Sequence, residues 1–159
     1  PQRGKILKIG KGRIIQEGTD LAILSFGAHM NVVKDATVAL AKMGVSVTIA
    51  DARFAKPLDE ELIKGLATSH DILITVEEGS CGGFGAQVSE FLINYGLLDG
   101  NLKFRIMNMP DHFLEQANPE VQRELARLSS AHIVTNVLSI LGRGQNLKDD
   151  GITISAKSS

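Results

Sequence analysis

The chain has 159 residues, and its 17 basic and 18 acidic side chains give a formal charge of −1 at neutral pH. This balance argues against nucleic-acid binding through bulk charge, and the 43% hydrophobic fraction argues against general disorder. No apolar run reaches the roughly 18 residues that a membrane-spanning helix needs, so no membrane partner is expected.

The first segment, residues 1–19, is interpreted as a linker that leads into a short strand at 13–16, which suits an antiparallel edge of a sheet. From residue 20 onward, short apolar runs typical of buried strands alternate with stretches that have one apolar helical face. Four further strands are expected at 21–24, 45–49, 72–76 and 102–106.

The helices between and after these strands are predicted from caps and apolar periodicity. Asp59, Asn118 and Ser130 are expected to cap helix starts, and Gly44 and Gly142 to end helices. The expected inner faces are Val33, Ala36, Leu40 and Met43; Leu62, Ile63 and Leu66; Val88, Phe91, Leu92 and Tyr95; Val121, Leu125 and Leu128; and Val134, Val137, Leu138 and Leu141.

This alternation predicts a three-layer α/β/α sandwich with a mostly parallel five-stranded sheet and one antiparallel edge strand, in a domain spanning residues 20–142. The polar residues 143–159 lack a period and are predicted to form a disordered tail. The single cysteine, Cys81, cannot form an internal disulfide, which fits a reducing compartment.

Arg53 is the strongest candidate for binding a ligand. It follows a predicted strand, and open α/β sheets bind ligands at the carboxyl ends of their strands. Its planar guanidinium matches a phosphate or carboxylate group bidentately. From these residues alone, a surface arginine paired with Asp51 or a loop carbonyl is the more frequent arrangement.

A glycine-rich turn at 79–85 opens the next helix directly after Glu77 and Glu78. Such a turn can bind an anion through backbone N–H groups, but it matches no dinucleotide or Walker pattern, and the two carboxylates disfavour phosphate. We therefore expect a tight strand-to-helix connection in which one carboxylate caps the turn, while the two side chains point to opposite faces. Cys81 lies in this turn without a nearby base, so it is not expected to act as a nucleophile.

Two further groups of side chains have weaker signals. The four histidines, His29, His70, His112 and His132, are too widely spaced to indicate a metal site. His29 shares the sheet edge of Arg53, although helix capping or plain solvation is expected for it. The basic run Arg3, Lys5, Lys8, Lys11 and Arg13 is interpreted as a solvated linker, with docking to an acidic partner as the alternative.

Four groups of segments together resemble the C-terminal domain of the 1-deoxy-D-xylulose-5-phosphate synthases, thiamine-diphosphate enzymes of the transketolase superfamily. They are 9–13 with Glu17-Gly18, 21–27, 53–61 with 69–71, and 75–78 with 82–85 and 109–113. The beta chains of 2-oxo-acid dehydrogenases share the Pro-Leu-Asp and Val-Glu-Glu elements, but Arg-Phe-Ala-Lys-Pro at 53–57 favours the synthases. A free-standing α/β binding or assembly module is the remaining hypothesis.

The resemblance implies that this chain belongs to a longer, homodimeric, cytoplasmic enzyme that condenses pyruvate with glyceraldehyde 3-phosphate and releases CO₂. It implies that Arg53 binds the phosphate of the aldehyde acceptor at the junction with the preceding domain. In the family, thiamine diphosphate and Mg²⁺ are held by the two preceding domains, and their Gly-Asp-Gly motif is absent from this sequence. We therefore expect no catalytic residue, cofactor site or metal site in this chain, which alone should be inactive.

Overall fold

A five-stranded sheet forms the centre of the molecule in the computed structural model, which describes residues 6–111 and 118–143. The strands are β1 (Arg13–Gln16), β2 (Leu21–Phe26), β3 (Val47–Asp51), β4 (Ile72–Glu77) and β5 (Lys103–Met107). Their order across the sheet is β1-β3-β2-β4-β5; β1 runs antiparallel to β3, and the other neighbours are parallel. The predicted mixed sheet with one antiparallel edge strand is confirmed.

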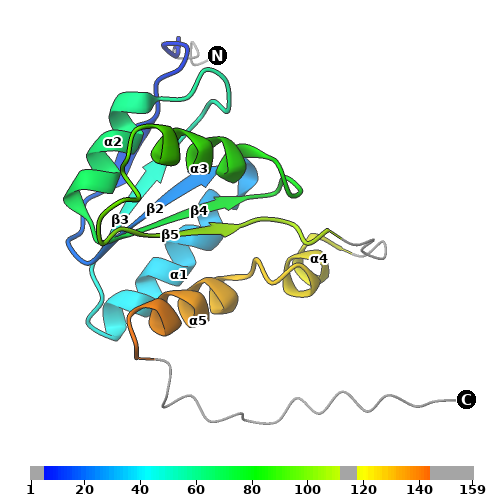
Figure 1. Ribbon diagram of the computed structural model, residues 1–159. Helices are drawn as coiled ribbons and strands as arrows, with labels where there is room; N and C mark the ends of the chain where they lie inside the picture. The colour runs from blue at the N-terminus through cyan, green and yellow to red at the C-terminus, as the bar shows by residue number, and fades with distance from the viewer. Residues whose placement is uncertain (1–5, 112–117, 144–159) are drawn as a thin grey trace, which may run out of the picture.

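Helices cover both faces of this sheet (Figure 1). α1 (Met30–Lys42) and α5 (Ser130–Ile140) lie on one face, and α2 (Glu60–Ser69) and α3 (Phe84–Asn94) on the other. Successive residues of β2 alternate between the two resulting cores, because strand side chains point to opposite faces in turn. Both faces of the sheet are therefore buried, which confirms the predicted three-layer sandwich.

The predicted helix starts are largely confirmed. Asp59 caps α2 by accepting a hydrogen bond from the Leu62 N–H at 3.2 Å, and Asn118 caps α4 (Pro119–Leu125) by accepting from the Val121 N–H at 3.0 Å. The cap of α5 was predicted one residue late, because Ser129 occupies the N-cap position.

Three predicted apolar faces are wrong in part. Met43 and Tyr95 are about half exposed, and each lies directly after the last residue of its helix, α1 or α3. Val121 and Leu125 of α4 are also about half exposed, whereas Leu128 is buried. The reason is that α4 ends at Leu125 and Arg127 then adopts a φ of +56°, so Leu128 does not continue the helical period.

Some expectations concern residues outside the described ranges. These are residues 144–159 of the predicted tail and residues 112–117, which include the end of the motif at 109–113. In the ranges that the structure does describe, no helix has the length and apolar character needed to cross a bilayer.

Candidate functional site

Arg53 occupies a sharp turn directly after β3. The Phe54 N–H donates to the Ala52 carbonyl at 2.6 Å, which closes a γ-turn with Arg53 at its centre. The φ angle of Arg53 is +59°, in the left-handed region that costs a residue with a side chain about 1–2 kcal/mol. Backbone strain of this kind persists only where the surroundings hold it, and it is concentrated at functional sites.

Hydrogen bonds on both sides hold this turn. The Ala52 N–H donates to the Ser25 carbonyl at 2.9 Å, which extends the pairing of β2 and β3 by one residue. The Arg53 N–H donates to Oδ1 of Asp51 at 3.1 Å. The strained residue is therefore fixed between the sheet and the last side chain of its own strand.

The Asp51 carboxylate faces two guanidinium groups at this edge of the sheet. Arg13 from β1 places both Nε and Nη2 at 3.1 Å from Asp51 Oδ2, whereas Arg53 Nε lies 3.9 Å from the same oxygen. Within the described residues the Arg53 side chain makes no hydrogen bond, and it is 21% exposed. Arg53 thus retains donors for an anion while Arg13 balances the charge of Asp51.

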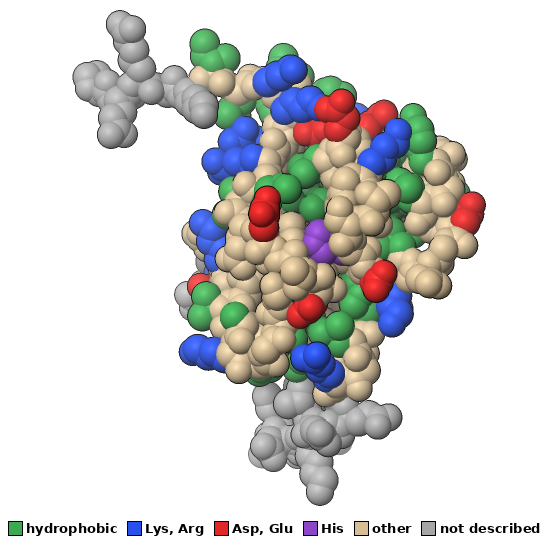
Figure 2. Space-filling view, turned by 90° about the vertical axis from the view of Figure 1, so that its left-hand side faces the viewer, with side chains coloured by type: hydrophobic (Ala, Val, Ile, Leu, Met, Phe, Trp, Pro, Cys, Tyr) green, Lys and Arg blue, Asp and Glu red, His purple; other side chains and the backbone are tan. Residues whose placement is uncertain are grey.

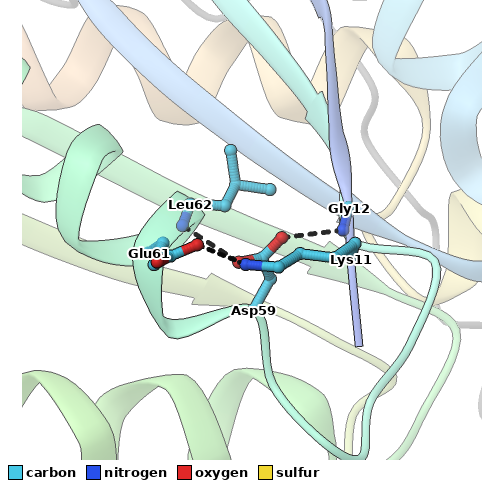
Figure 3. Close-up of polar contacts among 5 residues, drawn as sticks. All are labelled: Lys11, Gly12, Asp59, Glu61 and Leu62. Carbon is cyan, nitrogen blue, oxygen red and sulfur yellow. Dashed lines mark hydrogen bonds and ion pairs between the residues drawn. The ribbon is translucent and has the colours of Figure 1, made fainter. Parts of the chain in front are cut away.

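Asp59 connects the segment that precedes β1 to the Arg53 loop, which is the loop between β3 and α2 (Figure 3). Besides capping α2, the Asp59 carboxylate accepts from the Gly12 N–H at 2.9 Å and from Lys11 Nζ at 3.2 Å. Lys11 also pairs with Glu61 in the first turn of α2. A Cβ at residue 12 would lie 2.7 Å from the Asp51 carbonyl, so only glycine allows this close approach.

These contacts correct the interpretation of the basic run as a solvated linker. Lys11 and Arg13 are fixed in ion pairs, because the antiparallel pairing of β1 brings them against acidic side chains of β3 and α2. Arg3 and Lys5 lie outside the described residues.

The ion pairs also change the titration of the groups involved. Burial raises the pKa of Asp59, but the N–H groups of Gly12 and Leu62 together with the Lys11 ammonium outweigh this, so the pKa lies below its ordinary value. Lys11 in the same way lowers the pKa of Glu61, and its own pKa is raised by Glu61 and Asp59.

The glycine-rich turn is the tight connection that the sequence predicted. Glu77 is buried, and its carboxylate accepts from the N–H groups of Phe84 and Gly85 at 2.8 and 2.7 Å, so it occupies the helix end where an anion would bind. A Cβ at Gly83 would lie 2.5 Å from Glu77 Oε2, so the turn packs directly on this carboxylate. Cys81 is an exposed free thiol.

His29 differs from the expectation of capping or solvation, since its side chain is only 1% exposed. The 3₁₀ turn η1 (Gly27–His29) precedes α1 and packs against β4, which places the ring inside. Its Nδ1 lies 3.3 Å from Oε1 of Glu78, whereas Glu77 accepts from the Phe84 N–H, so the two adjacent carboxylates have separate partners. Burial lowers the pKa of His29, although Glu78 opposes this effect; Arg123 lowers it further.

Two hollows among the described residues lie away from Arg53. One of about 480 Å³ lies beside Asp35, Arg123 and Ser129, and one of about 400 Å³ lies between β1 and α2, beside Thr48 and His70. Basic and acidic side chains are interspersed on the face that Figure 2 shows. Across the described residues, no three His, Cys, Asp or Glu side chains are grouped to hold a metal ion.

The geometry brings together more residues than the sequence indicated. Arg53, Asp51 and the cap Asp59 were visible as candidates, but the involvement of Arg13 and Lys11 was not. Their partners are 38 and 48 residues away, so only the antiparallel pairing of β1 could have revealed them.

Comparisons with known proteins agree with this fold. The family model described as transketolase, C-terminal domain, matches residues 10–133. A solved structure of a split-gene transketolase, described as an inactive 'beta4 tetramer', aligns with a TM-score of 0.73 and 23% identity over 87% of this chain and 45% of that one. Transketolase from Campylobacter jejuni aligns with a TM-score of 0.60 and 15% identity over 82% of this chain and 18% of that one. The chain thus spans less than half the length of either protein.

Proposed function

The chain belongs to the transketolase C-terminal domain family, and we propose on this basis that it is the C-terminal domain of a 1-deoxy-D-xylulose-5-phosphate synthase. The parent enzyme would condense pyruvate with glyceraldehyde 3-phosphate and release CO₂, forming a precursor of isoprenoids, thiamine and pyridoxal. The resemblance of the sequence around Arg53 supports this choice within the family.

The observation that carries the proposal is the presentation of Arg53. A strained γ-turn holds it at the carboxyl end of β3, its guanidinium is not hydrogen-bonded within the described residues, and Arg13 balances the adjacent carboxylate. This arrangement suits a phosphate that approaches from outside the domain, since the Arg53 side chain is partly exposed at the end of its strand. Arg53 would hold the acceptor phosphate where this domain meets the rest of the enzyme.

The remaining parts of the reaction are assigned to the parent enzyme. Thiamine diphosphate with Mg²⁺ supplies the carbanion chemistry and would be held by the part of the enzyme outside this chain. The chain's own residues bind and orient the acceptor, whose phosphate lies away from the carbon that reacts. The split-gene transketolase neighbour is described as an inactive 'beta4 tetramer'. This description supports the proposal that this chain needs a cofactor-binding partner. A homodimeric, cytoplasmic parent stays a prediction.

The test is the exchange of Arg53 for alanine in the assembled enzyme. A charged hydrogen-bonded contact is worth roughly 1.5–3 kcal/mol, so Arg53→Ala should raise the KM for glyceraldehyde 3-phosphate about 10- to 100-fold and leave the KM for pyruvate unchanged. Arg105→Ala removes an exposed arginine from the opposite edge strand, β5, and serves as the matched control. An unchanged acceptor KM in Arg53→Ala would remove the assignment.

The same assay separates the alternatives. CO₂ release from pyruvate that depends on glyceraldehyde 3-phosphate supports the synthase. Release that instead requires a lipoyl acceptor identifies a 2-oxo-acid dehydrogenase, and turnover of a ketose phosphate in place of pyruvate identifies a transketolase. A chain that stimulates none of these reactions in any cofactor-binding partner would be a binding or assembly module.

A further inference from the structure

One carboxylate lies between two guanidinium groups at the carboxyl edge of the sheet. Asp51 ends β3, and in the antiparallel register it stands opposite Arg13 of β1. Arg13 uses two nitrogens on Asp51 Oδ2, both at 3.1 Å, whereas Arg53 approaches this oxygen only to 3.9 Å through Nε. The donors of Arg13 are therefore directed at Asp51, and those of Arg53 are not.

The second oxygen of Asp51 has a separate task. Oδ1 accepts the Arg53 N–H at 3.1 Å and so stabilises the γ-turn in which Arg53 has its positive φ. One side chain thus fixes the backbone of Arg53 through one oxygen and faces the guanidinium of Arg53 through the other.

Removal of Arg13 would leave Asp51 Oδ2 with Arg53 as the cation next to it. A carboxylate at the edge of a sheet attracts an adjacent guanidinium, and a pair formed in this way would draw the donors of Arg53 toward Asp51. Those donors would then be shared between Asp51 and an incoming anion. The competition would weaken anion binding without removing any group that touches the anion.

We infer that Arg13 and Asp51 are positioning residues for Arg53: Arg13 binds the Asp51 carboxylate and thereby leaves the Arg53 guanidinium available to the acceptor phosphate. The inference rests on the proposed function, because it takes the phosphate of the acceptor as the anion. It adds Arg13, on an edge strand, as a residue that sets acceptor affinity without contacting the acceptor.

A double-mutant cycle in the assembled synthase tests this role. Arg13→Gln should raise the acceptor KM about two- to fivefold, the effect expected for loss of a partly exposed ion pair, and should leave kcat and the pyruvate KM unchanged. Added to Arg53→Gln, the same change should have no further effect, because Arg13 acts only through Arg53. Arg13→Lys, which retains the charge, should recover part of the affinity.

Other outcomes of the cycle would overturn the inference. An acceptor KM in Arg13→Gln equal to that of the control Arg105→Gln would show that Arg13 does not act on Arg53. A loss in Arg13→Gln that adds in full to the loss in Arg53→Gln would show that Arg13 binds the acceptor directly. A fall in kcat with an unchanged acceptor KM would indicate a structural role only.

A titration of the 159-residue chain with inorganic phosphate separates this inference from the proposed function. The NMR signal of the backbone N–H at position 53, which Arg53→Gln retains, should respond to phosphate, with an apparent affinity two- to fivefold lower in Arg13→Gln. A response in the wild-type chain that Arg53→Gln abolishes and Arg13→Gln leaves unchanged would refute the positioning role alone. A phosphate response that persists unchanged in Arg53→Gln would refute the phosphate site itself.

Discussion

The carboxylate of Asp59 connects three parts of the chain, and its removal should weaken all of them together. It accepts hydrogen bonds from the N–H groups of Gly12 and Leu62 and from the ammonium of Lys11. Loss of an N-cap costs about 1 kcal/mol, and an N–H left without an acceptor in a partly buried position costs about 1–2 kcal/mol more. Asp59→Ala should therefore destabilise the protein by about 2–3 kcal/mol, which lowers Tm by about 6–9 °C at this chain length.

Thermal unfolding followed by circular dichroism measures this loss, and Glu60→Ala provides the control. Glu60 lies in the same first turn of α2 and is exposed, so its removal should cost less than about 0.5 kcal/mol. Hydrogen exchange adds a local measurement, because the Gly12 amide should exchange faster in Asp59→Ala. Equal melting temperatures for the two variants would refute the reasoning.

The pH dependence of the unfolding free energy tests whether the ionised form of Asp59 stabilises the fold. The pKa of Asp59 in the folded chain is held below its ordinary value of 3.8. At pH values between the two, the unfolded chain therefore binds more protons than the folded chain. The stability contributed by the ionised carboxylate is present above the ordinary pKa and is lost as the pH falls through the lower, folded value. Asp59→Asn should therefore flatten the curve of unfolding free energy below about pH 4 relative to the wild-type chain.

Two further predictions concern the interior and the turns. Gly83→Ala should destabilise the protein by about 1–3 kcal/mol, because the new Cβ would lie 2.5 Å from Glu77 Oε2. Gly65→Ala in α2, where a Cβ would meet no atom within 4 Å beyond its chain neighbours and the helix backbone, should instead stabilise the protein by about 0.5–1 kcal/mol. Equal urea midpoints for the two variants would contradict this prediction. Burial lowers the pKa of His29 below its ordinary value of 6.5, so the wild-type chain should lose stability as the pH falls below that value. His29→Phe should remove this part of the loss. Unfolding free energies from urea titrations that fall in parallel for both proteins from pH 7 to 5 would contradict this prediction.

Local patterns were sufficient for most of the secondary structure. The runs that form β2 and β4 are mostly apolar, since helices cover both faces of the sheet and bury nearly every residue of these strands, and such runs are typical of parallel strands. Asp59 and Asn118 could be assigned as caps because a cap satisfies N–H groups only two or three residues further along.

The failures concern features that depend on distant residues. His29 follows Gly27 in a pattern that suits an exposed helix start, but the additional 3₁₀ turn places its ring against β4. Leu128 is buried although Val121 and Leu125 are half exposed, because the positive φ of Arg127 interrupts the helical period between them, and nothing in the spacing of the apolar residues indicates this. In both cases the local sequence pattern was read correctly, but the backbone around it decided which side chains were buried.

The surroundings of Arg53 show why a site residue is easier to predict than the side chains that support it. Its place after β3 follows from the strand pattern, but the ion pair with Arg13 exists only because β1 pairs antiparallel with β3. Gly12, the residue before Arg13, is in turn bound to Asp59, at the end of the Arg53 loop. The two adjacent residues that precede and begin β1 thus hold both ends of the loop that contains the strained arginine. Since strain at a single residue is retained only when its neighbours fix it, the orientation of Arg53 depends on the segment that precedes β1 as much as on its own strand.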